Sequence, residues 1–116
     1  MAFQAGRVNM ATVQQWTSEE FEKAVSQGVV LADFYAVWCG PCKMMMSILE
    51  KAVSAFDENQ LKVGKINIDE CRELAAQYKI RTIPTFIIFK DGQVVDVLIG
   101  VQSQNMLVNA IRNALD

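Results

Sequence analysis

Histidine is absent from all 116 residues of the sequence. Without an imidazole, the chain cannot form a Ser-His-Asp or Cys-His nucleophile system, and it has no histidine metal ligand. No unperturbed side chain then titrates near neutrality, so a general base has to be a carboxylate or an amine with a shifted pKa. The sequence also contains no P-loop and no glycine-rich dinucleotide motif, and we therefore expect no bound cofactor.

A basic surplus and a long apolar run are missing as well. The formal net charge is −2, which leaves no basic stripe of the kind that binds nucleic acid or an anionic membrane. Residues 1–10 hold one basic residue and no apolar run long enough for a signal peptide. We therefore expect a cytoplasmic protein with no nucleic-acid or membrane partner.

The length and the apolar content together predict one folded unit. A chain of 116 residues fits a single domain, because domains commonly contain 100–150 residues. A hydrophobic content of 52% is enough for a substantial core. We expect a flexible leader over residues 1–10 and one domain over residues 11–116.

Cys39 and Cys42 lie three residues apart, where an apolar run gives way to a helical pattern. Gly40 permits a tight turn, and Pro41 has its φ angle preset for the first turn of a helix. Residues i and i+3 of a helix have Cβ atoms about 5–6 Å apart, only slightly more than a disulfide requires. The pair can therefore form and break a disulfide with little movement.

A helix start favours negative charge on the nearer sulfur. The free N–H groups and the helix dipole stabilise a thiolate, and Cys39 at the first turn gains most from them. We expect Cys39 to be the acidic, exposed nucleophile that attacks a target disulfide, and Cys42 to release the mixed disulfide. A purely structural disulfide is the alternative interpretation. It is disfavoured because closing so short a loop would constrain the unfolded chain little. A zinc site commonly takes four Cys or His ligands, but the chain has only three cysteines and no histidine.

The segment DFYAVWCGPCK, residues 33–43, resembles the active-site segment of the thioredoxin family. The similarity continues in the family's order through KINID at 65–69, IRTIPTF at 80–86, KDG at 90–92 and GV at 100–101. It covers roughly residues 11–115 of the chain. The resemblance implies a monomer with a three-layer α/β/α thioredoxin fold, in which four helices flank a central five-stranded mixed sheet.

Hydrophobic spacing and turn residues predict where these elements lie. We expect a short strand before Trp16, a helix that ends by Gly28, and an Asp91-Gly92 hairpin. The expected strands cover 29–36, 61–68, 85–89 and 93–99. The expected helices cover 18–27, which starts with capping-box spacing at Thr17 to Glu20, a stretch beginning at Cys39, 69–78 with Asp69 as its cap, and a stretch capped by Ser103. The expected apolar stripe of the second helix consists of Met45, Ile48, Leu49, Ala52, Val53 and Phe56. That of the fourth helix consists of Met106, Leu107, Ala110, Ile111, Ala114 and Leu115.

Asp33 interrupts an otherwise apolar strand. Burial of a carboxylate there raises its pKa towards the range of a general base, although water or a cation at the end of the sheet could equally satisfy it. The resemblance implies that Asp33 lies beneath the cysteine pair and helps Cys42 to lose its proton. It also implies that Lys65 is the electrostatic partner of Asp33, whereas the sequence alone leaves Lys65 as an edge lysine.

The resemblance further implies how substrates bind. An X-Pro bond is normally trans, but in the family the bond that matches Ile83-Pro84 is cis and the proline packs opposite the cysteines. The residue before it then presents its backbone to an extended substrate. We expect a shallow apolar substrate-binding platform around Cys39, formed by Trp38, Gly40, Pro41, Ile83, Pro84, Gly100 and Val101.

The function that this resemblance implies is general reduction of protein disulfides. The expected partners are diverse disulfide-containing proteins and a thioredoxin reductase, which supplies the NADPH and FAD. Two alternatives remain open: a disulfide oxidase or isomerase, and a binding subunit that uses the same surface without turnover. Cys71 lies outside these motifs, and we treat it as incidental rather than as a regulatory thiol. We likewise assign the Met44–Met46 run to core filling rather than to a metal site.

Overall fold

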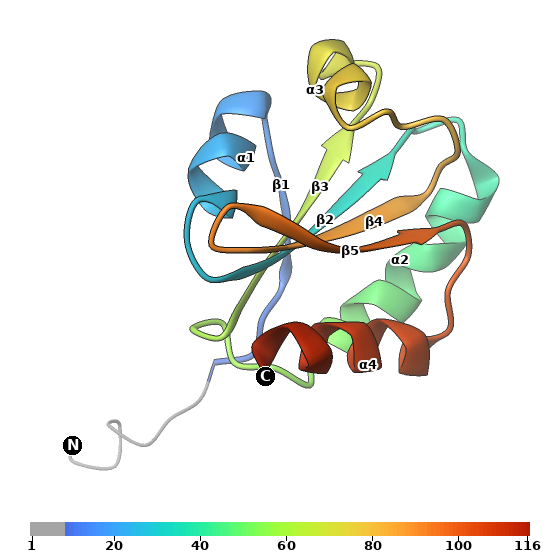
Figure 1. Ribbon diagram of the computed structural model, residues 1–116. Coiled ribbons are helices and arrows are strands. Elements are labelled where there is room, and N and C mark those ends of the chain that lie inside the picture. Colours follow the sequence, from blue (N-terminus) through green and yellow to red (C-terminus); the bar gives the residue numbers. More distant parts are fainter. Residues whose placement is uncertain (1–8) are drawn as a thin grey trace.

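A computed structural model describes residues 9–116 of the protein, and Figure 1 shows the order of its elements along the chain. The elements are β1 (Val13–Gln15), α1 (Ser18–Val25), β2 (Val29–Tyr35), α2 (Gly40–Val53), β3 (Leu61–Asn67), α3 (Arg72–Gln77), β4 (Thr85–Lys90), β5 (Gln93–Ile99) and α4 (Gln104–Leu115). Among the described residues, no helix is long and apolar enough to cross a membrane.

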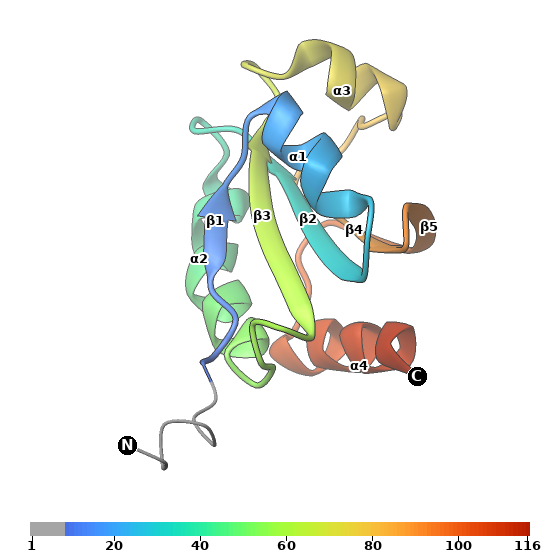
Figure 2. The same ribbon diagram turned by 90° about the vertical axis from the view of Figure 1, so that its left-hand side faces the viewer.

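One mixed sheet forms the middle layer. The strands lie in the order β1-β3-β2-β4-β5. β1, β3 and β2 run parallel, whereas β4 and β5 are antiparallel to their neighbours. Helices α1 and α3 lie on one face of the sheet and α2 and α4 on the other, as the two views show together (Figures 1 and 2). This arrangement confirms the predicted three-layer fold.

The alternation of side chains along β2 divides the core in two. Val29 and Leu31 pack into the cluster that contains the buried residues of α2 and α4. Val30, Ala32 and Phe34 pack into the cluster below α1 and α3. Because successive strand residues point to opposite faces, both sides of β2 are buried. An almost continuous apolar run is therefore what this strand requires.

Local signals mark the start of α1 correctly. The Thr17 side chain accepts the Glu20 N–H at 3.1 Å, and the Glu20 carboxylate accepts the Thr17 N–H at 2.9 Å, which completes a capping box. The helix ends at Val25, two residues before the predicted boundary, and Gly28 turns the chain with φ of 73°. On α4, Ser103 caps the helix as predicted, but Met106 is 53% exposed and does not join the buried face.

The third helix is shorter than predicted. It covers Arg72–Gln77 with Cys71 at the N-cap, so the expectation that Asp69 caps it is wrong. Asn67 ends β3 instead, and its side-chain oxygen accepts the backbone N–H groups of Asp69 and Glu70 at 2.8 and 3.3 Å. This local turn delays the helix, because it satisfies N–H groups that a cap would otherwise serve.

Part of the predicted leader makes contacts with the fold. Met10 forms an isolated antiparallel bridge with Asp57, and the Asn9 carbonyl accepts the Glu58 N–H at 2.7 Å. These two residues therefore differ from the prediction of a flexible leader over residues 1–10. Residues 1–8 of that leader lie outside the described residues.

Candidate active site

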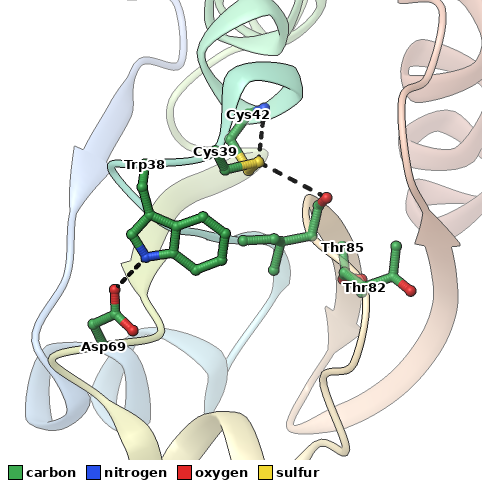
Figure 3. The surroundings of a disulfide bond; sticks show 7 residues. Trp38, Cys39, Cys42, Asp69, Thr82 and Thr85 are labelled. Carbon is green, nitrogen blue, oxygen red and sulfur yellow. Dashed lines mark hydrogen bonds between the residues drawn. A yellow bond between two sulfur atoms is a disulfide. The ribbon is translucent and has the colours of Figure 1, made fainter.

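The cysteine pair lies where α2 begins. Cys39 is the N-cap residue, and its sulfur accepts the backbone N–H of Cys42 at 3.2 Å. A disulfide joins the two cysteines, with a Cα–Cα distance of 5.3 Å, which lies within the usual range. Figure 3 shows the sulfur of Cys39 between this N–H group and a carbonyl oxygen of the loop before β4. The helix start predicted from Gly40 and Pro41 therefore brings a backbone donor to the first sulfur.

The disulfide is largely covered. Cys39 is 5% exposed and Cys42 3% exposed, so the expectation of an exposed Cys39 does not hold for the disulfide-bonded protein. Ala36 completes this small buried cluster, and Ile83 packs against it. The Ile83 carbonyl oxygen lies 3.9 Å from the Cys39 sulfur. The loop that contains Ile83 therefore lies directly beside the Cys39 sulfur.

Most of the predicted substrate-binding platform lies at the surface near the disulfide. Trp38 is 65% exposed and Val101 52% exposed. Gly40 and Pro41 are exposed, and Ile83 and Gly100 are half-buried. Pro84 is buried instead, and its peptide bond with Ile83 is cis. Its carbonyl accepts the Gly100 N–H at 2.8 Å, which joins the loops that carry Ile83 and Val101.

Trp38 has a partner that the sequence analysis missed. The indole Nε1–H donates to the Asp69 carboxylate at 2.8 Å, as Figure 3 shows. This contact fixes the direction of a large, exposed ring. The sequence gives only a weak signal for this contact: parallel strands end at the same edge of a sheet, but the fold decides which strands are neighbours. Tyr35 pairs with Asn67 in register, so the segments that follow β2 and β3 emerge side by side.

Asp33 lies inside the sheet, 1% exposed, and its Oδ1 atom has no hydrogen-bond partner. It has the same strand parity as Val29 and Leu31, so its side chain faces the α2 layer. Burial raises the pKa of Asp33 from 3.8 to about 7, and the charge of Lys65 offsets part of that rise. A carboxyl group with this pKa can exchange a proton near neutral pH.

Lys65 is the register partner of Asp33 on β3. Its ammonium nitrogen lies 4.9 Å from the centroid of the Tyr35 ring. The Tyr35 hydroxyl in turn donates to the Gln15 side-chain oxygen at 2.9 Å. Tyr35 and Gln15 were not among the predicted site residues, because their link to Lys65 joins three strands.

The residues of the Met44–Met46 run differ in burial. Met45 is fully buried in the core, whereas Met44 is 56% exposed. Cys71 is buried at the start of α3, among residues of the α1 and α3 cluster. Within residues 9–116, no group of three or more histidine, cysteine, aspartate or glutamate side chains could hold a metal ion.

These features define a class of protein. A disulfide at the first turn of a helix, a buried carboxyl group on the adjacent central strand and helices on both faces of a mixed sheet describe a thiol–disulfide oxidoreductase domain. The comparisons with known proteins identify the family within this class.

The thioredoxin family model matches residues 12–113. Thioredoxin from Bacillus subtilis (strain 168) is 40% identical over 99 residues, which cover 85% of this chain and 94% of the relative. Thioredoxin from Staphylococcus aureus is 41% identical over 95 residues, which cover 82% of this chain and 90% of the relative. The chain therefore belongs to the thioredoxin family.

Solved structures agree with this assignment. Thioredoxin from Malassezia sympodialis is 32% identical with a TM-score of 0.80, and the match covers 95% of this chain and 96% of that one. Thioredoxin from Trypanosoma brucei brucei is 31% identical with a TM-score of 0.78, and 88% of each chain is covered. With its Cys39-Cys42 pair in place, the protein is a disulfide reductase of the thioredoxin type. A binding subunit without turnover and a disulfide oxidase or isomerase are not favoured.

Proposed function

We propose that Cys39 is the attacking thiol and Cys42 the resolving thiol in the reduction of disulfides on a range of partner proteins. The observation that carries this assignment is the Cys42 N–H group, which donates to the Cys39 sulfur at 3.2 Å. A backbone donor at a helix start stabilises negative charge on that sulfur. Cys42 lies within the first turn of α2, behind the N-cap residue Cys39, so we assign it the second, resolving attack.

The exchange transfers two electrons from the dithiol to the target. The Cys39 thiolate attacks one sulfur of the target disulfide, forms a mixed disulfide and releases the other target sulfur as a thiolate. Cys42 then loses its proton and attacks the Cys39 sulfur. The Cys39-Cys42 disulfide forms, and the second target sulfur leaves as a thiolate. The target is reduced and the cysteine pair is oxidised.

Asp33 accepts the proton of Cys42 in this scheme. Its buried position and its pKa of about 7 support this role, because a general base works best when its pKa lies near the working pH. Lys65 offsets part of the burial effect on Asp33, which keeps the carboxyl group able to release its proton again near neutrality. Both residues thus serve the resolving step.

The surface around Cys39 binds the substrate. Trp38, Gly40, Pro41, Ile83, Gly100 and Val101 form an apolar platform, and the buried Pro84 supports it from below. The Ile83 backbone lies beside the Cys39 sulfur and offers strand-like hydrogen bonds to an extended segment of the partner. A platform with few polar groups accepts many partners, because it rejects few of them.

A thioredoxin reductase returns the oxidised pair to the dithiol, and the NADPH and FAD belong to that partner. We place the protein in the cytoplasm, as a monomer in which residues 11–116 act as one domain. The reducing conditions of that compartment favour a dithiol over a structural disulfide.

Reduction of insulin disulfides with NADPH and a thioredoxin reductase tests the overall reaction. Trapping then tests the two roles: Cys42→Ser accumulates a covalent complex with a disulfide substrate, whereas Cys39→Ser does not, because only the nucleophile can form the mixed disulfide. Non-reducing electrophoresis measures the complex. Trapping by Cys39→Ser alone would reverse the assignment, and equal trapping by both variants would refute it.

A further inference from the structure

A row of polar side chains crosses the sheet below α2. Gln15 on β1 pairs in register with Lys65 on β3, and Lys65 pairs with Asp33 on β2. Register partners point to the same face, and Tyr35, two residues after Asp33, points to that face as well. Three side chains, from β1, β2 and β3, therefore lie on the same face of the sheet as the buried carboxyl group.

Three of these residues hold one another in place. The Lys65 ammonium nitrogen lies 4.9 Å from the centroid of the Tyr35 ring, within the distance of a cation–π contact. The Tyr35 hydroxyl donates to the Gln15 side-chain oxygen at 2.9 Å. The Gln15 amide nitrogen lies 3.5 Å from the Lys65 backbone carbonyl oxygen. The ring that holds the ammonium group is thus anchored on the strand next to that of Lys65.

One oxygen of the carboxyl group next to Lys65 has no partner. Asp33 Oδ1 is buried and has no hydrogen-bond partner, although a lysine occupies the adjacent register position. An unpaired buried carboxylate would normally attract a nearby ammonium group. The Lys65 nitrogen lies at the Tyr35 ring instead. The ring therefore competes with the carboxyl group for the charge of Lys65.

We propose that Tyr35 is a positioning residue for disulfide exchange: its ring, anchored by Gln15, holds the Lys65 ammonium group away from the Asp33 carboxyl group. A direct Lys65–Asp33 ion pair would favour the carboxylate and weaken it as a base. Tyr35 prevents that pairing, so that Asp33 can accept a proton near neutral pH. This inference rests on the proton-accepting role proposed above for Asp33.

Among the groups that face Asp33, Lys65 carries the charge that can shift its titration. Phe86, its register partner on β4, is apolar and fully buried. From the α2 layer, the cluster on this face contains Met45, also fully buried, and the titratable Cys42 lies one turn earlier, where it is tied up in the disulfide. In the oxidised protein, the titration of Asp33 therefore reports on Lys65 and its restraint by Tyr35.

The test is to titrate Asp33 directly in the oxidised protein, using the ¹³C NMR signal of its carboxyl carbon. Tyr35→Leu removes the ring, and we expect the midpoint to fall by about one pH unit or more as Lys65 pairs with Asp33. Tyr35→Phe keeps the ring and should give a smaller fall. Tyr78→Leu, at the other tyrosine and in the cluster on the opposite face, is the matched control and should leave the midpoint unchanged.

A double variant shows whether the effect passes through Lys65. In a Lys65→Met background, Tyr35→Leu should no longer lower the midpoint. The inference is overturned if the midpoint stays or rises in Tyr35→Leu, if the fall persists without Lys65, or if Tyr35→Phe matches Tyr35→Leu. Because the NMR titration does not depend on turnover, its outcome is separate from that of the insulin assay, which tests the proposed function.

Discussion

At the scale of single residues, the burial of Asp33 makes the stability of the protein depend on pH. Its pKa is raised from 3.8 to about 7, chiefly by burial. Between about pH 4 and pH 7 the folded protein keeps a proton on Asp33 that the unfolded chain has already released. Stability from this group is therefore greatest below pH 4, falls as the pH rises to 7, and is constant above it. At about 1.4 kcal/mol per unit, the whole loss is at most about 4 kcal/mol.

We predict that Asp33→Asn stabilises the protein at pH 8 by up to about 4 kcal/mol and leaves its stability at pH 3.5 nearly unchanged. The same change slows disulfide exchange at neutral pH by tenfold or more, because Cys42 loses its proton acceptor. Urea unfolding at several pH values and single-turnover exchange kinetics measure the two effects. A variant that is less stable at pH 8, with unchanged kinetics, would contradict both parts.

Much of this residue-scale behaviour could be foreseen. A carboxylate inside an apolar strand is unusual enough to indicate a shifted pKa, and the CxxC spacing with Gly-Pro indicates which sulfur begins the helix. The partner of Trp38 could not be read in the same way. Asp69 was interpreted as a helix cap, because aspartate is common at that position, and only the adjacency of β2 and β3 brings it to the indole.

At the scale of elements, short-range signals were the most dependable. The capping box of α1, the Ser103 cap of α4 and the Asp91-Gly92 hairpin all formed as predicted. The hairpin also makes a contact that its own sequence did not indicate. Asp91 exchanges hydrogen bonds with Gly28: its carboxylate accepts the Gly28 N–H at 2.8 Å, and its N–H donates to the Gly28 carbonyl at 3.0 Å.

The residue at position 91 must therefore adopt a φ angle of 49° and provide a side-chain hydrogen-bond acceptor. We predict that Asp91→Ala lowers the free energy of unfolding by about 1–2 kcal/mol, since it loses the hydrogen bond and tolerates the left-handed conformation poorly. Asp91→Asn keeps both features and should cost less than half as much. Urea denaturation compares the two variants, and equal losses would rule out this explanation.

At the scale of the whole molecule, the Trp16 ring packs tightly against the backbone of β3. Trp16, just before α1, lies against Gly64 in β3, and a Cβ atom on Gly64 would overlap its indole ring. Trp16 is 9% exposed and belongs to the core below α1 and α3. The absent side chain at Gly64 thus makes room for a large apolar surface.

We predict that Gly64→Ala destabilises the protein by about 1–3 kcal/mol, because the indole must shift and the layer must repack. Gly40→Ala is the matched control: apart from its chain neighbours and the backbone of its own helix, no atom lies within 4 Å of the added Cβ. The unfolding free energy should therefore change by less than about 0.5 kcal/mol. Thermal unfolding followed by near-ultraviolet circular dichroism reports on both stability and Trp16. Similar losses in the two variants would exclude the proposed overlap as the cause.

The sequence by itself determined the features whose causes lie within a few residues. These are the cysteine pair at a helix start, the caps of α1 and α4, the hairpin and the two-sided burial of β2. Its series of motifs also identified the family, and with it the sheet and helix count. Each of these depends on spacing along the chain, which the sequence states directly.

Only the tertiary structure decided what those residues touch. The Trp38–Asp69 bond, the Gln15–Tyr35–Lys65 contacts and the Trp16–Gly64 packing all join segments far apart in the chain. The coverage of Cys39 and the burial of Pro84 also emerged only there. The physical reason is that such contacts follow from strand order and register, which are set by the packing of the whole core rather than by any local pattern.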